Sequence, residues 1–474
     1  MTGDTTPAAK TIGLADAIAL THKRMDAGRW GEAEAMARRI LIAAPKNFPA
    51  LRALGTILEH TGRIDEALQT FESIIEVNPG SGIAFTRRAA ILLRRQWGPP
   101  PQPRSPATGP RIMCSSLGAN GRFANQLLQY AVTRLYAEDH GLAAEFPDWI
   151  GRDLYDFDDP LLGPLLPTLS EKDADIAGAL SGRTATALAG HDLWGYFQKS
   201  SQDFARHRER FRQMFKPGRR LAGLPTAWMS NLGAGARPLV ALHLRRGDFA
   251  KSSMWIAPED WYLAWLRDLW PRLKRPLLYI ATDDPSVLAA FSAYAPLTVN
   301  DVGPALPGAE FYPDFHVLTQ ATHLAISNSS FSFVAAMLNE HGVEFMRPER
   351  DTARLIAFDP WNAPITLPQD SRLTEGEQLA RRLLDAVPNH FPALIALAEI
   401  LEQTDRPDEA LQAYDKAITA NPRSAAAFLG RGKLLTRAGQ PREALAAFQT
   451  AIDLDPDNAK LRADVARAMA AGLG

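Results

Sequence analysis

The residues best suited to chemistry follow a short apolar stretch near the middle of the chain. Residues 239–244 are mostly branched and apolar, which predicts a buried strand; this stretch includes His243 and leads into Arg245, Arg246 and Asp248. In open α/β sheets, ligands bind beyond the carboxyl ends of the strands, where paired arginines can bind a diphosphate through rigid, charged donors. The alternative is a surface turn in which the arginines pair with Asp248.

A second candidate anion site lies at the start of a predicted helix. Residues 118–131 contain a glycine-bearing loop that leads into a helical pattern. The first turn of a helix offers unpaired backbone N–H groups, which favour anions. Asn125 and Gln126 can hydrogen-bond phosphate or sugar hydroxyls there, although Asn125 could instead only cap the helix.

Two acids follow the predicted strand at residues 277–282. Either Asp283 or Asp284 can accept N–H groups from a guanine ring or bind a ribose hydroxyl, and the other would cap the helix that Pro285 begins. Neither acid has a histidine at metal-ligand spacing, so direct recognition of a ligand is favoured over a cation site.

A cluster of hydroxyls and amides follows another predicted strand, at residues 321–327. Asn328, Ser329 and Ser330 stand just before a helix, where side chains and helix N–H groups can bind phosphate oxygens together. The alternative is an ordinary capping loop. An aromatic cluster at residues 191–198 could line a sugar cleft or belong to the core.

These clusters need a scaffold that brings strand ends together. Over residues 111–368, strand-like and helix-like segments alternate. Such alternation is typical of parallel sheets with crossover helices. We therefore predict an α/β domain at 111–368, built from two halves with a cleft between them.

Helical repeats flank this domain on both sides. Within each flank, prolines recur at the 34-residue tetratricopeptide period, at Pro45 and Pro79 and at Pro388, Pro422 and Pro456. We predict all-α arrays at 12–95 and 372–472, with residues 459–471 as a final capping helix. The Pro-rich segment 96–110 is predicted to be a linker. Such arrays offer a concave surface to a peptide or protein, or serve as structural or dimerising appendages.

Composition limits the classes of partner. The chain of 474 residues carries 52 basic and 53 acidic residues, a net charge of -1, so no global field attracts nucleic acid or an anionic membrane. Cys114 is the single cysteine, which excludes an internal disulfide and a multi-cysteine zinc site. The polar start and the lack of a long apolar run predict a cytoplasmic protein without a membrane span.

Together, the motifs resemble those of the α1,2-fucosyltransferase family of inverting glycosyltransferases. They keep the family's order, at residues 121–126 with 129–131, 195–198, 243–248, 282–284 and 327–332. Residues 282–286 are also similar to the core α1,6-fucosyltransferases, which share the His-X-Arg-Arg-X-Asp motif. The resemblance implies a GT-B-like fold of two facing α/β domains, GDP-fucose as the donor, and no required metal or other cofactor.

The same resemblance implies roles for individual residues. Arg245 and Arg246 would neutralise the departing diphosphate. The donor-binding residues would be Asn125, Gln126, His243, Asp283, Asp284, Asn328, Ser329 and Ser330. Inversion also needs a base, for which Asp248, Asp314 and His316 are candidates, while Asp248 could instead hold the arginines in place.

We therefore predict a GDP-fucose-dependent glycosyltransferase that acts on a hydroxyl of a glycan or glycan-bearing acceptor. The repeats would recruit the acceptor or a protein or peptide partner. The alternative is a tetratricopeptide-repeat interaction scaffold whose middle domain is a degenerate sugar-nucleotide-binding module. A third possibility is a transferase for another GDP sugar.

Overall fold

The computed structural model describes residues 13–78, 80–105, 109–235, 237–246, 256–350, 352–367, Val465, and 380–455 apart from 382, 385, 386, 404, 405 and 439. The chain divides into two compact units, Met1–Leu367 and Pro368–Gly474. The N-terminal helices therefore share one unit with the α/β region.

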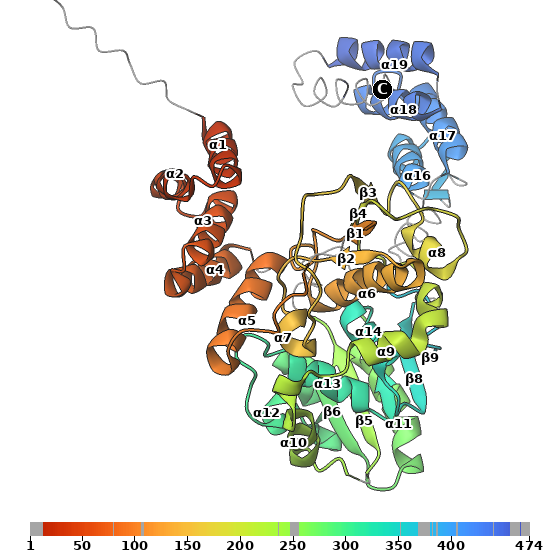
Figure 1. Ribbon diagram of the computed structural model, residues 1–474. Helices are drawn as coiled ribbons and strands as arrows, with labels where there is room; N and C mark the ends of the chain where they lie inside the picture. Colours follow the sequence, from red (N-terminus) through yellow and green to blue (C-terminus); the bar gives the residue numbers. More distant parts are fainter. Residues whose placement is uncertain are drawn as a thin grey trace, which may run out of the picture. The chain divides into compact units, whose positions relative to one another are not determined.

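The first unit begins with a stack of antiparallel helices, drawn in red and orange in Figure 1. They are α1 (Leu14–Asp26), α2 (Trp30–Ala43), α3 (Phe48–His60), α4 (Ile64–Val77) and α5 (Gly82–Trp97). Asn47 and Ser81 cap α3 and α5, because their side chains accept hydrogen bonds from backbone N–H groups of the first turn. Gly55 lets α3 and α4 approach closely, since a Cβ there would lie 2.8 Å from the Phe71 ring.

The first half of the α/β region contains a sheet in the order β2-β1-β4-β3, whose pairings are all parallel. Its strands are β1 (Arg111–Met113), β2 (Ala143–Glu145), β3 (Thr168–Ser170) and β4 (Asp192–Trp194). The crossover from β1 to β2 is the long helix α6 (Phe123–His140), which ends at Gly141 in the left-handed conformation. Most of α6 is buried, so this helix lies in the core of the unit.

The second half contains a sheet in the order β6-β5-β7-β8-β9, parallel except for the antiparallel pair of β8 and β9. Its strands are β5 (Leu239–Leu244), β6 (Leu277–Thr282), β7 (His323–Ala325), β8 (Glu344–Glu349) and β9 (Arg354–Ala357). Its main helices are α11 (Glu259–Leu269), α13 (Tyr312–Gln320) and α14 (Ser330–Leu338).

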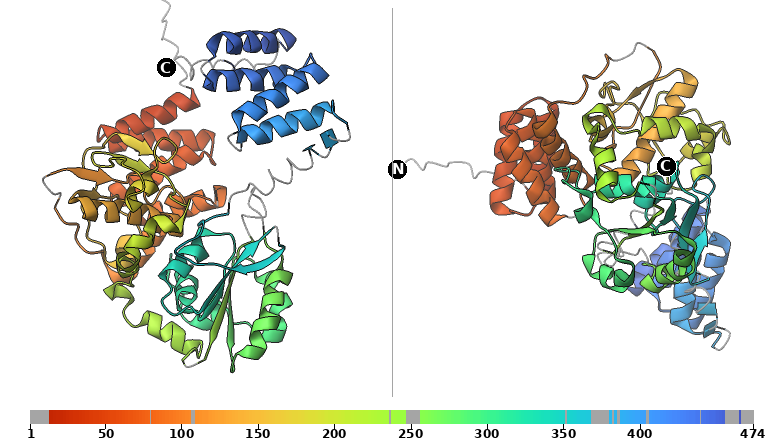
Figure 2. Two further views of the ribbon diagram at one scale, coloured as in Figure 1. Left: turned by 90° about the vertical axis from the view of Figure 1, so that its right-hand side faces the viewer. Right: turned by 90° about the horizontal axis from the view of Figure 1, so that it is seen from below.

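Strand β5 is buried along its whole length because helices cover both faces of its sheet. Val240 and Leu242 pack in the cluster that contains α11, whereas Leu239 and Ala241 pack in the cluster that contains α13 and α14. Figure 2 shows the sheet between these helices. The apolar run of β5 thus places the polar residues that follow it at the carboxyl end of this inner strand.

Short helices complete the first unit. They are α7 (Gly151–Tyr155), α8 (Ile176–Ser181), α9 (Arg208–Met214), α10 (Leu224–Asn231), α12 (Val299–Val302) and the 3₁₀ helices Ser201–His207, Arg219–Leu221, Trp270–Arg272 and Pro285–Tyr294. The last of these was expected from the sequence as a helix, and Asp284 caps its first turn.

The second unit is helical. It contains α16 (Phe391–Gln403), α17 (Pro407–Ala420), α18 (Ala425–Arg437) and α19 (Pro441–Leu454). Gly430 and Gly432 admit the rings of Tyr414 and Phe448, as Gly55 admits Phe71 in the first array. The expected capping helix at 459–471 lies outside the described residues except for Val465. Across the described parts of both units, no helix combines the length and the apolarity needed to cross a membrane.

Candidate functional site

A cavity of about 510 Å³ lies in the first unit, lined by both halves of the α/β region and by helix α5. The start of α6, the ends of β5 and β6 and the start of α14 all contribute to it. The predicted site residues in its lining are Asn125, Gln126, His243, Arg245, Asp283, Asn328, Ser329 and Ser330. The fold therefore gathers residues that are up to 205 positions apart in sequence.

Asn125 joins the two halves of the α/β region. Its Oδ1 accepts a hydrogen bond of 2.7 Å from Ser330 Oγ, at the start of α14, and another from Gln198 Nε2, which follows β4. The helix α6 begins one turn earlier with Arg122 as its N-cap, and no side chain caps it. Asn125 is therefore a bridge between the halves and does not cap its helix.

His243 lies at the end of β5 as a buried, neutral imidazole. Its Nδ1 hydrogen-bonds Ser332 Oγ at 2.8 Å and Ser327 Oγ at 2.9 Å. Burial, together with the charges of Arg245 and Arg246, lowers the pKa of His243 to about 3. The ring is thus uncharged at neutral pH and is held by two hydroxyls, one from Ser327 before α14 and one from Ser332 in its first turn.

The two arginines after β5 have different environments. Arg245 lines the cavity, and its Nη1 lies 3.0 Å from Asp283 Oδ2. Arg246 is 8% exposed and is absent from the lining; its Nη2 lies 2.8 Å from Glu259 Oε1 on α11. Asp283 also accepts a 2.7 Å hydrogen bond from the backbone N–H of Arg246. Arg245 and Asp283 therefore line the cavity, whereas the Arg246 guanidinium is bound to Glu259 outside the lining.

The other predicted donor-binding residues form hydrogen bonds within the protein. Asp284 lies outside the lining and caps the 3₁₀ helix after β6, where hydrogen bonds from Ser286 lower its pKa. Asn328 Oδ1 accepts from the backbone N–H of Leu367 at 2.8 Å. Ser329 caps α14 and also lines the cavity, so the capping-loop and ligand-binding interpretations both fit this residue.

The three candidate bases are placed differently. Asp314 lines the cavity, and the Tyr279 hydroxyl donates a 2.5 Å hydrogen bond to its Oδ1. Burial raises the pKa of Asp314 to about 7. His316 is absent from the lining and lies with its ring centroid 5.7 Å from that of Trp228. Asp248 lies outside the described residues.

Helix α5 adds residues that the sequence motifs did not indicate. Gly82, Phe85 and Thr86 line the cavity although they belong to the N-terminal helical array. Thr86 Oγ1 accepts a 3.1 Å hydrogen bond from Gln126 Nε2, which also donates to Gly121 O at 3.2 Å. No local pattern could have predicted this contact, because it joins two segments that each fold with their own neighbours.

The described residues include no group of three or more histidine, cysteine, aspartate or glutamate side chains that could hold a metal ion. The polar side chains that line the cavity include two arginines, several hydroxyls and amides, one histidine and two carboxyls. Such a set can bind an anionic, hydroxyl-rich ligand through hydrogen bonds and charge.

Comparison with solved structures gives weak likenesses. A crystal structure of NodZ alpha-1,6-fucosyltransferase soaked with GDP-fucose is 14% identical, with 52% of this chain and 97% of that chain covered and a TM-score of 0.37. A structure of fucosyltransferase NodZ from Bradyrhizobium is 13% identical, with 52% and 96% covered and a TM-score of 0.36. The P58(IPK) TPR domain is 10% identical, with 96% and 97% covered and a TM-score of 0.20. These low scores assign neither a family nor an activity to the chain.

Comparison with sequences identifies the flanking helices. No curated protein sequence matches the chain. Family models for the tetratricopeptide repeat match residues 24–87 at one end and residues 369–425, 395–459 and 429–472 at the other. The prediction of repeats on both flanks is confirmed, and the chain carries tetratricopeptide repeats on either side of its α/β region.

Proposed function

We propose that the α/β region is a glycosyltransferase that moves fucose from GDP-fucose to a hydroxyl acceptor with inversion. The observation that carries the proposal is the gathering of Arg245, His243, Asn125 and Ser330 around one cavity. A protein that binds a nucleotide sugar needs a positively charged side chain for the diphosphate and hydrogen-bonding groups for the sugar. This lining supplies both. Two sheets with a cavity that both halves line also support a GT-B-like arrangement.

In the proposed reaction, the acceptor oxygen forms a bond to the anomeric carbon of fucose. The bond from that carbon to the β-phosphate oxygen breaks, GDP leaves with the electron pair, and the acceptor proton passes to a base. Arg245 stabilises the charge that develops on the leaving diphosphate, an effect for which loss of one preorganised donor costs about 10²-fold or more in rate. Asp248 stays a candidate base, and no metal is invoked.

Arg246 contributes indirectly, because it helps to hold Asp283 and Arg245 in position. Its backbone N–H and the Arg245 guanidinium bind the two oxygens of Asp283, so Asp283 fixes the orientation of Arg245. Glu259 in turn holds the Arg246 side chain. We therefore propose that Arg245 contacts the ligand and that Arg246 is a positioning residue, because only Arg245 lines the cavity.

Asp314 is suited to recognition of the nucleobase. It is a carboxyl group at the cavity wall, with Phe311 and Phe331 also in the lining. A guanine ring presents two neighbouring N–H donors that one carboxylate can accept, and aromatic rings favour a flat purine. Asp283 is already bound to both arginines and Asp284 is a helix cap, which makes Asp314 the better guanine ligand.

The proposal is tested by donor hydrolysis measured for GDP-fucose, GDP-mannose, UDP-glucose and UDP-N-acetylglucosamine, with and without EDTA. The proposed function predicts that GDP-fucose is hydrolysed fastest, that EDTA changes nothing, and that Arg245→Ala removes the activity. Faster hydrolysis of GDP-mannose would keep the site and change the sugar. The scaffold alternative predicts no hydrolysis and no melting-temperature shift with GDP.

Asp314→Asn separates recognition of the base from catalysis by this residue. If Asp314 binds guanine, the variant loses affinity for GDP and its preference for GDP over ADP. If Asp314 instead takes the acceptor proton, the variant keeps its GDP affinity and loses only kcat.

A further inference from the structure

One wall of the cavity belongs to the last helix of the N-terminal repeats. Gly82 of α5 lies so close to the loop before α6 that a Cβ on Gly82 would be 2.2 Å from Gly121 O. One turn further along α5, Phe85 lines the cavity and is 39% exposed. The Arg122 guanidinium lies over its ring, 5.7 Å from the ring centroid. A repeat helix therefore contributes an exposed aromatic ring to the candidate site, beside a cation from the α/β region.

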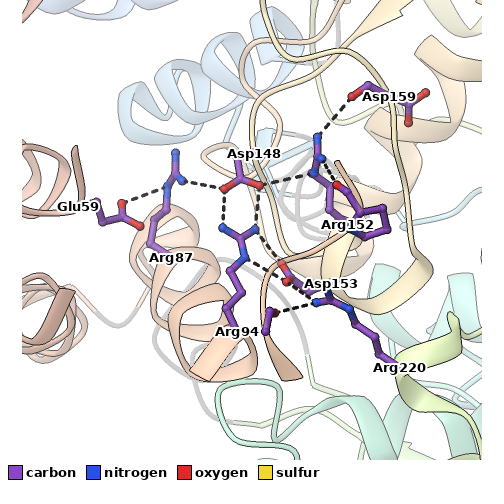
Figure 3. Close-up of polar contacts among 10 residues, drawn as sticks. Glu59, Arg87, Arg94, Asp148, Arg152, Asp153, Asp159 and Arg220 are labelled. Atoms are coloured by element: carbon purple, nitrogen blue, oxygen red, sulfur yellow. Dashed lines mark hydrogen bonds and ion pairs between the residues drawn. The ribbon is translucent and has the colours of Figure 1, made fainter. Parts of the chain in front are cut away.

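Ion pairs hold α5 in this position (Figure 3). Arg94 of α5 donates to Asp148 through Nη1 at 2.6 Å and to Asp153 through Nη2 at 2.9 Å. Asp153 is fully buried, and Arg220 also approaches it, at 3.5 Å. The place of Phe85 at the cavity is thus fixed by buried and half-buried charges between α5 and the α/β region.

The aromatic cluster at residues 191–198, for which the sequence allowed a place in a sugar cleft or in the core, divides in the structure. Phe197 is 1% exposed and packs in the core of the first unit, whereas Tyr196 is 39% exposed. Tyr196 lies against the same loop as α5, since a Cβ on Gly121 would be 2.8 Å from Tyr196 Cε1. Gln198 lines the cavity. One member of the cluster thus belongs to the core, and its two neighbours lie at the candidate site.

The turn that carries Tyr196 is held in a strained conformation. The two carboxylate oxygens of Glu171 accept hydrogen bonds from the backbone N–H of Tyr196 at 2.7 Å and of Phe197 at 2.9 Å. Phe197 has a φ of 55°, in the left-handed region that a bulky side chain rarely adopts. Such strain persists only where the surrounding groups determine the conformation, and it is concentrated at catalytic and ligand-binding sites. The exposed Tyr196 ring is therefore held beside the cavity at a cost in backbone energy.

Two exposed aromatic rings next to one loop suit a saccharide. A pyranose ring has a face of C–H groups that packs on the electron-rich face of an aromatic ring, and its hydroxyls need polar partners. Phe85 and Tyr196 offer the aromatic surface, and Arg122 and Gln198, which line the cavity, carry hydrogen-bonding groups. An extended polypeptide would instead need a row of donors and acceptors for its backbone, which two rings do not supply.

The two rings and the proposed GDP ligands belong to different parts of the α/β region and its flanking helix. Asn125 connects these parts, because its Oδ1 accepts hydrogen bonds from Gln198, in the turn that carries Tyr196, and from Ser330 at the start of α14. Arg245 and the other proposed GDP ligands follow β5 and β6 or belong to α13. In an inverting transfer, the acceptor approaches the anomeric carbon from the face opposite the leaving group. Rings from outside the GDP-binding half therefore suit the acceptor.

We propose that Phe85 of the repeat helix and Tyr196 form the acceptor subsite and bind a saccharide by its C–H face. This inference rests on the proposed glycosyltransferase function and makes the N-terminal repeats a part of the site itself. A hydroxyl oxygen of the bound saccharide forms the bond to the anomeric carbon of fucose. The bond from that carbon to the β-phosphate oxygen breaks, GDP leaves with the electron pair, and the hydroxyl proton passes to a base.

The test uses the full chain, GDP-fucose labelled in its sugar, and two acceptor sets, one of free mono- and oligosaccharides and one of peptides that contain serine or threonine. Phe85→Ala and Tyr196→Ala remove the rings, whereas Phe85→Tyr and Tyr196→Phe keep them. Ile42→Ala is the matched control, because it removes an apolar side chain of α2 that is 82% exposed and lies outside the lining. The melting-temperature shift with GDP is measured for every protein.

The inference predicts that the wild type labels saccharides. Phe85→Ala and Tyr196→Ala should each raise the KM for a labelled saccharide about tenfold, as expected for the loss of one aromatic contact, with little change in kcat or in the GDP shift. The variants that keep a ring, and Ile42→Ala, should retain the KM of the wild type. A change that only loosened the fold would instead lower kcat and the GDP shift as well.

Three results would overturn the inference while leaving the proposed function in place. One is a GDP shift in the wild type with no label on any saccharide, whether or not a peptide is labelled. Another is an unchanged saccharide KM in Phe85→Ala or in Tyr196→Ala. The third is loss of the GDP shift in Phe85→Ala, which would place that ring at the nucleotide. Absence of any GDP shift in the wild type would instead remove the proposed function, and the acceptor subsite would fall with it.

Discussion

Ser330 donates a 2.7 Å hydrogen bond to Asn125, and this contact joins the starts of two helices from opposite halves of the α/β region. Each residue also lines the cavity. The relative position of the halves at the candidate site thus depends on side chains that could also contact a ligand. Changes at this bond should alter stability and ligand binding together.

The first prediction concerns this bond. Ser330→Ala and Asn125→Ala should each destabilise the first unit by about 1 kcal/mol, and the double variant should cost less than the sum because both changes remove the same hydrogen bond. A double-mutant cycle followed by urea unfolding measures the coupling. Strictly additive effects would show that the bond does not join the halves in solution.

The second prediction separates the two arginines. Arg245→Ala should abolish the GDP-induced melting shift and lower kcat by about 10²-fold or more, with little change in the melting temperature of the ligand-free protein. Arg246→Ala should lower that melting temperature by several degrees, because it leaves Glu259 without its buried partner.

Glu259→Gln is the matched variant for the Arg246 side chain. It should reproduce part of the stability loss of Arg246→Ala and retain GDP binding. If Arg246→Ala left the ligand-free melting temperature unchanged and removed GDP binding, Arg246 would have to reach the ligand, contrary to the assignment of Arg245 alone.

The third prediction concerns pH and Asp314. The pKa of this residue in the folded protein is about 7, above its ordinary value of 3.8, so the folded state holds the proton more tightly than the unfolded chain. The stability that this proton contributes is present at low pH and is lost as the pH rises through about 7. Asp314→Asn should therefore raise the melting temperature by a few degrees at pH 8 and change it little at pH 4.

GDP affinity should depend on the same ionisation of Asp314. It should increase over the pH range in which the stability decreases. A carboxylate accepts the N–H groups of guanine only when it is ionised, so GDP affinity should increase as the pH rises through about 7. His243 should contribute no inflection near neutral pH, because its pKa is about 3. Calorimetric titration from pH 5.5 to 8.5 checks this, and a pH-independent affinity that survives Asp314→Asn would contradict the role of Asp314.

The fourth prediction concerns the charges that hold α5. Arg94→Ala should destabilise the first unit by about 3 kcal/mol or more, because Asp153 would remain buried without its main partner. Hydrogen exchange in α5 should increase as the helix loosens. Arg95→Ala on the same helix is the control, since Arg95 pairs with the exposed Asp65 and its loss should change little. Equal losses of stability in the two variants would show that the ion pairs of Arg94 do not hold α5 to the α/β region.

Local sequence patterns predicted the elements that carry the site. The apolar run of β5 and the 34-residue proline spacing of the repeats can each be seen along the sequence without knowledge of contacts between distant segments. The different environments of Arg245 and Arg246 could not be predicted, because they depend on the ion pair of Arg246 with Glu259, at the start of α11, and no sequence motif indicated this pair.

The part of the site that comes from the repeats was also beyond local patterns. Phe85 has the spacing of an ordinary helical residue, and its place at the cavity depends on the approach of Gly82 to Gly121. Asp314 was a candidate base by residue type alone, and its burial beside Tyr279 gives it a different proposed role. The position of Phe85 and the proposed role of Asp314 both depend on contacts between segments that are distant in sequence.

The most direct test of the central claim is calorimetric titration of the full chain with GDP, with UDP as the comparison and Arg245→Ala as the variant. The account predicts that the wild type binds GDP with one site per chain, binds UDP at least tenfold more weakly, and loses GDP binding in the variant. Wild-type protein that does not bind GDP, or an Arg245→Ala variant that binds it as tightly as the wild type, would contradict the account.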